Sequence, residues 1–169
     1  RNRGYKTIAK ITGEQPTLIY NGIKIPIDRG TKRVMQYENH AVLRSFLKRV
    51  HSEDKVALIL ENQGISEYTT RNFNESFSMA DIVMVTNIRP DHADTMGTYN
   101  RLTRAFGRSV SSEKDVIICE QDKPTRNYLD SIMTKYGAKV HSVDIPSEFE
   151  SHIAAETIHG VNKILEVLD

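Results

Sequence analysis

A dense group of polar side chains directly follows an apolar, β-branched run at residues 82–85. The group combines an amide, a guanidinium, carboxylates and an imidazole, in the order Asn87, Arg89, Asp91, His92 and Asp94. If the apolar run is a buried parallel strand, these side chains lie at its carboxyl end, where α/β sheets bind their ligands. An imidazole and carboxylates can hold or orient a hydrated cation there, and a guanidinium can pair with a carboxylate or phosphate. A solvent-exposed turn is the alternative, since Asp, Asn, Pro and Gly are common turn residues.

A second candidate ligand follows another apolar run. Residues 56–60 read Val-Ala-Leu-Ile-Leu, and Glu61 comes next. From position alone, Glu61 is either a metal ligand or a solvent-facing residue at a strand end. Magnesium takes one or two protein groups and fills its remaining positions with water and phosphate oxygens, which suits Glu61 together with His92. A structural zinc site would need four nitrogen or sulfur ligands and fits these residues poorly.

The elements that must position these side chains alternate between strand and helix patterns. Asn21-Gly22 joins two short β-rich runs, which predicts a hairpin with a type I′ turn. Pro124 is expected in the first turn of a helix that Gly137 ends, and a capping box from Ser147 to Glu150 is expected to open the final helix. We expect strands at residues 5–11, 17–20, 22–27, 56–60, 82–85, 116–119 and 138–143, and helices at 33–50, 66–79, 98–110, 124–136 and from 147 to about 168. The pattern predicts an α/β fold: a mainly parallel sheet with helices on both faces and a small β-hairpin insertion.

Composition excludes several classes of protein. The 169 residues fit one domain, and the net charge of +1, with basic residues dispersed along the sequence, argues against bulk nucleic-acid binding. No signal peptide is apparent, and no apolar stretch approaches the roughly 20 residues that span a bilayer. The single cysteine, Cys119, cannot form an internal disulfide and is expected to be buried and inert, so a cytoplasmic, reducing compartment is expected.

Two stretches resemble one known family. Residues 86–97, Thr-Asn-Ile-Arg-Pro-Asp-His-Ala-Asp-Thr-Met-Gly, resemble the T-N-[IV]-x-x-D-H-[LM]-D-x-[ML]-G signature of the central domain of the Mur ligase superfamily. The Arg-Pro pair and the final Met-Gly are most similar to the poly-γ-glutamate synthase branch. Residues 4–13 resemble the passage that follows the phosphate-binding loop and its helix in that branch, with Ile11 in place of a Thr.

The resemblance implies roles for individual residues. Glu61 matches the glutamate that holds magnesium in the superfamily, although residues 62–64 depart from the usual run and leave the shape of the acceptor pocket in doubt. The resemblance implies three groups of site residues: metal ligands Glu61 and His92; catalytic residues Arg89 and Asp91; and residues near nucleotide or substrate, Asn87, Thr12, Gly13 and Arg29.

The resemblance also implies an activity, namely ATP-dependent, magnesium-dependent ligation of glutamate to a poly-γ-glutamate chain through an acyl phosphate. It makes residues 1–169 part of an ATP-binding central domain, with a phosphate-binding loop upstream and a further segment downstream, so we expect the chain alone to be inactive. Partners would be glutamate, the polymer and membrane-bound synthase subunits of capsule biosynthesis, with no nucleic acid; recruitment to the inner face of the membrane and a homo-oligomer are left open. A non-catalytic scaffold of the same fold, or another amino-acid ligase of the superfamily, is the alternative.

Overall fold

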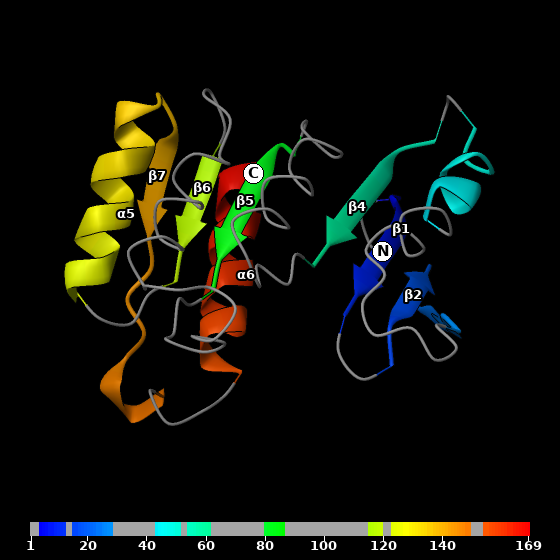
Figure 1. Cartoon of the computed structure of the whole chain (residues 1–169), viewed down its shortest axis with the longest axis horizontal. Coiled ribbons are helices and arrows are strands. Elements are labelled where there is room, and N and C mark those ends of the chain that lie inside the picture. Colours follow the sequence, from blue (N-terminus) through cyan, green and yellow to red (C-terminus); the bar gives the residue numbers. More distant parts are fainter. Residues whose placement is uncertain are drawn as a thin grey trace. The chain divides into compact units, whose positions relative to one another are not determined.

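In the part of the chain that it describes, a computed structural model contains the strands β1 to β7, the helices α5 and α6, and shorter helical segments (Figure 1). The described residues are 4–12, 15–28, 43–51, 54–61, 80–86, 115–119, 123–149 and 154–169. The chain divides into two compact units, Arg1–Gln63 and Gly64–Asp169, and each unit is described here by itself.

The first unit is built on a four-stranded sheet in the order β3-β2-β1-β4. Its strands are β1 (Lys6–Ile11), β2 (Thr17–Tyr20), β3 (Ile23–Pro26) and β4 (Val56–Leu60). β1 pairs with β4 in parallel, whereas β1 with β2 and β2 with β3 are antiparallel. Asn21 has φ 49° and Gly22 has φ 88°, which is the positive φ that a type I′ turn needs at both positions. The predicted hairpin insertion is therefore confirmed.

A short helical segment packs on this sheet. Residues 43–47 are helical. Of the rest of the helix expected at 33–50, residues 33–42 lie outside the described residues and residues 48–50 form a turn. Leu43 is fully buried, and the ring of Phe46 lies 5.9 Å from that of Tyr20 between centroids. The segment is thus held by apolar contact with the end of β2.

The second unit contains a parallel three-stranded sheet with a helix on each face (Figure 1). Its strands run in the order β5 (Ile82–Val85), β6 (Asp115–Ile118) and β7 (Lys139–Ser142), and its helices are α5 (Lys123–Lys135) and α6 (Ala155–Leu168). Alternate residues of β6 face opposite ways: Val116 and Ile118 pack with Leu129 of α5, whereas Ile117 packs with Ile164 of α6. Cys119 is fully buried on the α6 face. The expected α/β fold, with a mainly parallel sheet and helices on both faces, is confirmed.

The helix α5 begins and ends close to where the sequence predicts. Pro124 is the second residue of the helix, and Gly137 follows it with φ 80°. The Gly137 N–H donates to the Thr134 carbonyl (2.9 Å), and the Ala138 N–H donates to the Met133 carbonyl (3.0 Å). These are the two hydrogen bonds of a Schellman motif, which satisfies the last carbonyls of the helix.

The final helix begins later than the capping box predicts, so that prediction is wrong. Ser147–Phe149 forms a single 3₁₀ turn, and α6 starts at Ala155. Ala154 occupies the N-cap position and makes no capping hydrogen bond with its side chain. A local S-x-x-E pattern can close one turn without starting the helix, because the length of a helix is set by the face that it packs against the sheet. The helices expected at residues 66–79 and 98–110 lie outside the described residues.

Gly160 allows α6 to approach the sheet closely. A Cβ placed on this residue would lie 2.5 Å from the Met84 Sδ atom and closer still to the Cys119 Sγ atom. Met84 belongs to β5 and Cys119 directly follows β6, so the glycine fits the helix against two strands. Among the described helices, none is long and apolar enough to cross a membrane.

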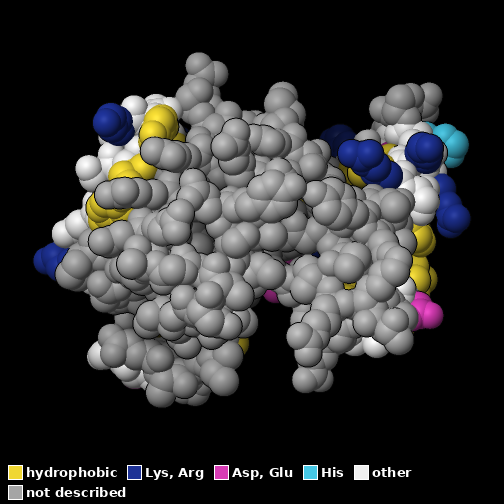
Figure 2. All heavy atoms as spheres, in the orientation of Figure 1, with side chains coloured by type: hydrophobic (Ala, Val, Ile, Leu, Met, Phe, Trp, Pro, Cys, Tyr) yellow, Lys and Arg dark blue, Asp and Glu magenta, His cyan; other side chains and the backbone are white. Residues whose placement is uncertain are grey.

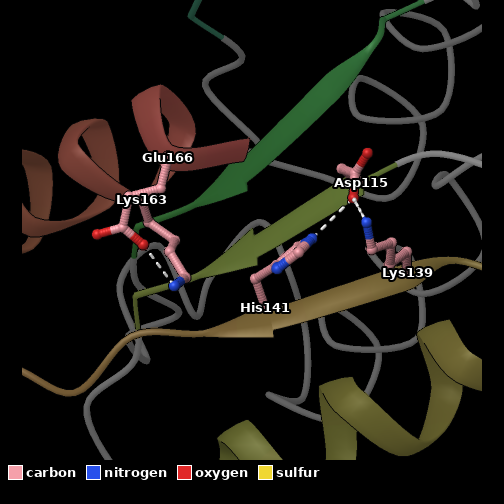
Figure 3. A network of polar contacts seen from close by, with 5 residues as sticks. All are labelled: Asp115, Lys139, His141, Lys163 and Glu166. Carbon is pink, nitrogen blue, oxygen red and sulfur yellow. Dashed lines mark hydrogen bonds and ion pairs between the residues drawn. The ribbon is translucent and has the colours of Figure 1, made fainter. Parts of the chain in front are cut away.

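A polar network closes the amino ends of β6 and β7 (Figure 3). The Nε2 atom of His141 lies 2.7 Å from the Oδ1 atom of Asp115, and the Nζ atom of Lys139 lies 3.6 Å from the same oxygen. On α6, Lys163 pairs with Glu166 at 2.6 Å. The hydrogen bond from His141 is the main reason that the pKa of Asp115 is lowered from its ordinary 3.8, with Lys139 adding to the effect.

We predict that Gly160→Ala lowers the free energy of unfolding by about 1–2 kcal/mol. Overpacking of a filled core costs about 1–3 kcal/mol, and contacts this close place the cost at about 2–3 kcal/mol, which exceeds the gain of about 1 kcal/mol in helix propensity. Urea unfolding followed by circular dichroism measures the effect, with the exposed Thr157→Ala on the same helix as the control. Adding Cys119→Ala to Gly160→Ala should recover part of the loss. An unchanged free energy of unfolding for Gly160→Ala would show that the close packing against the sulfur atoms is wrong.

We further predict that Asp115→Asn destabilises the protein at neutral pH but less in acid. A carboxyl group with a lowered pKa in the folded state stabilises that state above its unfolded pKa, and the stabilisation is lost as pH falls through the folded pKa. The difference in urea midpoint between wild type and Asp115→Asn should therefore be fully present at neutral pH and shrink below pH 4. Glu148→Gln, which removes an exposed carboxylate of the same unit, is the control. A difference that stays constant with pH would contradict the assignment of the Asp115–His141 pair.

Candidate active site

The carboxyl ends of β1 and β4 lie side by side, because the two strands pair in parallel. Lys10 is in register with Leu60, so Thr12, which follows β1, and Glu61, which follows β4, leave the sheet at the same edge. The Glu61 N–H continues the ladder by donating to the Lys10 carbonyl at 3.0 Å. The sheet therefore brings together two residues that the sequence predicts to belong to one site.

A hydrogen bond joins these two strand ends. The backbone N–H of Thr12 donates to the Oε2 atom of Glu61, so the carboxylate is held against the start of the segment that follows β1. Glu61 is otherwise exposed. A carboxylate fixed in this way presents oxygen atoms to solvent, which is the ligand type that a hard divalent cation prefers.

The buried side chain of Lys10 contacts the backbone of Glu61. Its side chain is 1% exposed, and its Nζ atom donates to the main-chain carbonyl of Glu61 at 3.3 Å. Burial lowers the pKa of the Lys10 ammonium, and the Glu61 carboxylate opposes that effect. The buried amine therefore ties the backbone at residue 61 to β1 from within the unit.

Sequence reasoning gave no role to Lys10, although a signal for it exists. Lys10 and Ile8 are two residues apart on β1, so they point to the same face, and Ile8 is fully buried. A lysine at an inward position of a strand needs a polar partner, because an isolated buried charge is costly. Here that partner is the backbone of the candidate ligand.

The arrangement fits a divalent cation only in part. No group of three or more His, Cys, Asp and Glu side chains that could hold a metal occurs within the described ranges. Glu61 supplies one carboxylate. This suits magnesium, which takes few ligands from the protein, but it is too few for a metal held by protein ligands alone. A cation at Glu61 would take its other ligands from water, from phosphate oxygens or from residues beyond those ranges.

The other residues predicted for the site lie outside the described residues. They are Gly13, Arg29, Asn87, Arg89, Asp91 and His92. β5 ends at Val85, directly before this polar segment, and runs parallel to β6, as the sequence predicts. Whether His92 and Glu61 share a cation therefore stays a prediction.

Comparison with known proteins identifies the family. Residues 5–166 match the model of the Mur ligase middle domain. The chain is 25% identical over 120 residues to PGA synthase CapB of Bacillus subtilis (strain 168), a match that covers 70% of this chain and 30% of that protein.

Solved structures share the fold. One is a bifunctional folylpolyglutamate synthase/dihydrofolate synthase from Yersinia pestis complexed with AMPPNP and Mn ion, with a TM-score of 0.56, 15% identity, and coverage of 84% of this chain and 37% of that one. Another is E. coli FolC in complex with DHPP and ADP, with a TM-score of 0.55, 21% identity, and coverage of 82% of this chain and 36% of that one. The chain thus spans about a third of the length of these proteins. Because the family match extends over nearly all of the sequence and the fold agrees with it, the chain belongs to the Mur ligase middle-domain family.

Proposed function

We propose that the protein is an ATP-dependent amide ligase that adds glutamate to a poly-γ-glutamate chain through an acyl-phosphate intermediate. The observation that carries the proposal is the Glu61 carboxylate, held by the Thr12 N–H at the joined ends of β1 and β4. Membership of the Mur ligase family supports the ligase chemistry, and the similarity to PGA synthase CapB supports the polymer as substrate.

The proposed reaction has two steps. A carboxylate of the growing chain attacks the γ-phosphorus of ATP, which forms the acyl phosphate and releases ADP. The amine of the incoming glutamate then attacks the acyl carbon, so that an amide bond forms and inorganic phosphate leaves. Such reactions depend mainly on positioning and on neutralising negative charge.

The residues of the chain take the following roles in this proposal. Glu61 and His92 would hold magnesium, and Asn87 would bind a water of the metal or the nucleotide. Magnesium, when bound, offsets the charge of the phosphate oxygens. Arg89 stabilises the anionic phosphoryl group or a substrate carboxylate, and Asp91 orients His92.

Three more residues are assigned to nucleotide or substrate binding, namely Thr12, Gly13 and Arg29. The hydrogen bond from the Thr12 N–H to the Glu61 carboxylate supports the assignment of Thr12, since it places this residue beside the proposed metal ligand. The Mn ion and AMPPNP of the Yersinia pestis enzyme support nucleotide and divalent metal as the cofactors.

We extend the proposal to the setting of the reaction. A poly-γ-glutamate ligase would use glutamate and ATP from the cytoplasm and would be recruited to the inner face of the membrane by membrane-bound subunits of a capsule synthase. This part rests on the resemblance of residues 86–97 to the poly-γ-glutamate synthase branch.

Glu61→Gln is predicted to reduce glutamate-dependent phosphate release from ATP by about 100-fold or more. The amide keeps the size of the side chain but removes the charge that holds the cation, and loss of one such electrostatic group typically costs 10²–10³ in rate. The assay uses the protein expressed from the complete gene, with a panel of amino acids in place of glutamate. Asp54→Asn removes a carboxylate at the opposite end of β4 and should keep near wild-type activity.

Several outcomes would count against the proposal. Equal activity of Glu61→Gln and wild type would remove Glu61 from the site. Phosphate release that depends on an amino acid other than glutamate would point to a different ligase of the superfamily. Nucleotide binding without turnover by any amino acid would favour a non-catalytic scaffold.

A further inference from the structure

Exposed cations gather on one part of the first unit, although they are dispersed along the sequence. Arg44, Lys48, Arg49 and Lys55 are all exposed, and His51 lies among them in the chain. Figure 2 shows Lys and Arg side chains together with a His side chain over this part of the unit. We call Arg44, Lys48, Arg49 and Lys55 the basic face.

The fold explains how these side chains come together. The Lys48 N–H donates to the Arg44 carbonyl at 3.1 Å, which places the two residues one helical turn apart on the same side. The guanidinium of Arg49 lies over the ring of Phe46, 4.8 Å from its centroid. Lys55 directly precedes β4, and its carbonyl accepts a hydrogen bond from the Lys6 N–H at 2.8 Å. The basic face therefore lies at the amino ends of β1 and β4.

The positive charge of the basic face is not neutralised within the described part of the first unit. Asp54 pairs with Lys6 at 2.7 Å, and this contact lowers the pKa of Asp54 and raises that of Lys6. Glu61 follows β4, and Asp28 follows β3, which runs in the same direction as β4. Both carboxylates therefore lie at the carboxyl ends of these strands, away from the basic face. No described carboxylate pairs with the four cations of the face.

Stability does not account for this arrangement. Like charges at positions i and i+4 of a helix, as at Arg44 and Lys48, destabilise it by a few tenths of a kcal/mol. The carboxyl end of a helix favours cations, which would explain the positions of Lys48 and Arg49. It would explain neither Arg44 nor Lys55. This accumulation of positive charge, which no described carboxylate pairs with, instead suits a polyanionic ligand.

We propose that the basic face binds the poly-γ-glutamate chain and retains it between additions, an inference that rests on the function proposed above. The polymer carries one carboxylate per residue, and a guanidinium can bind a carboxylate with two parallel hydrogen bonds. Several weak contacts on one chain add up to firm retention.

The position of the face fits this role. Lys55 and Glu61 flank the two ends of β4, whose five residues span roughly 17 Å at about 3.3 Å per residue. A growing chain could therefore be held at the amino ends of the strands while its reactive end reaches the candidate site at their carboxyl ends. The face would contact residues that were added earlier, and it takes no part in the chemistry.

Binding of end-labelled poly-γ-glutamate, measured by fluorescence anisotropy without ATP, tests the proposal. Arg44→Glu/Lys48→Glu is expected to weaken binding by about tenfold or more and to flatten its dependence on salt. Lys123→Glu/Lys135→Glu, which reverses two exposed cations of α5, changes the net charge equally and should bind within about threefold of wild type. Arg49→Gln/Lys55→Gln provides a milder change if the double reversal does not fold, as judged by circular dichroism.

Three results would overturn the proposal. The first is that the wild type does not bind the polymer at low salt, and the second is that both charge-reversal variants lose the same affinity for it. The third is that the face binds phosphatidylglycerol vesicles or RNA but not the polymer. The assay contains no nucleotide, so it is independent of ligase activity. If the polymer binds in a way that depends on Arg44 and Lys48 but the protein has no ligase activity, the role of the basic face is supported and the proposed reaction is contradicted.

Discussion

The parallel pairing of β1 with β4 fixes the position of the candidate site, because parallel strands end at the same edge of a sheet. A single register sets Lys10 opposite Leu60, and this brings the Thr12 N–H within reach of the Glu61 carboxylate. A shift of one residue would turn the side chains of β4 to the other face and separate the two groups. The hairpin of β2 and β3 supports this register from the other side of β1, so the site depends on the whole four-stranded sheet.

Charge is divided between the two ends of that sheet. At the carboxyl ends, Glu61 is exposed, and the buried ammonium of Lys10 donates to its backbone carbonyl. Burial of Lys10 is costly unless its hydrogen bonds are made, so the contact with Glu61 favours one conformation at residue 61. At the amino ends, the charges of Arg44, Lys48, Arg49 and Lys55 remain exposed. The same unit therefore has a carboxylate held by a backbone N–H at one end of the sheet and a separate group of exposed cations at the other.

Features set by local chemistry could be predicted from the sequence. Asn21-Gly22 predicts the hairpin because few other residue pairs adopt positive φ twice in succession, and Gly137 predicts the end of α5 for a similar reason. The start of α6 could not be predicted in this way, since the Ser147 pattern closes only a 3₁₀ turn and packing against the sheet decides where the helix begins. The roles of Lys10, and of Asp115 with His141, depend on which strands are neighbours, and a single sequence does not specify register. Of the predicted site residues, the structure brings together Thr12 and Glu61, whereas the cluster from Asn87 to His92 lies outside the described residues.

The most direct test of the central claim is pulsed electron paramagnetic resonance of Mn²⁺ bound to the protein with a non-hydrolysable ATP analogue. We expect a ¹⁴N modulation from an imidazole ligand that disappears in His92→Gln while manganese stays bound, and a loss of most manganese binding in Glu61→Gln. A spectrum without nitrogen coupling in the wild type, or one that neither substitution changes, would show that Glu61 and His92 do not share a cation.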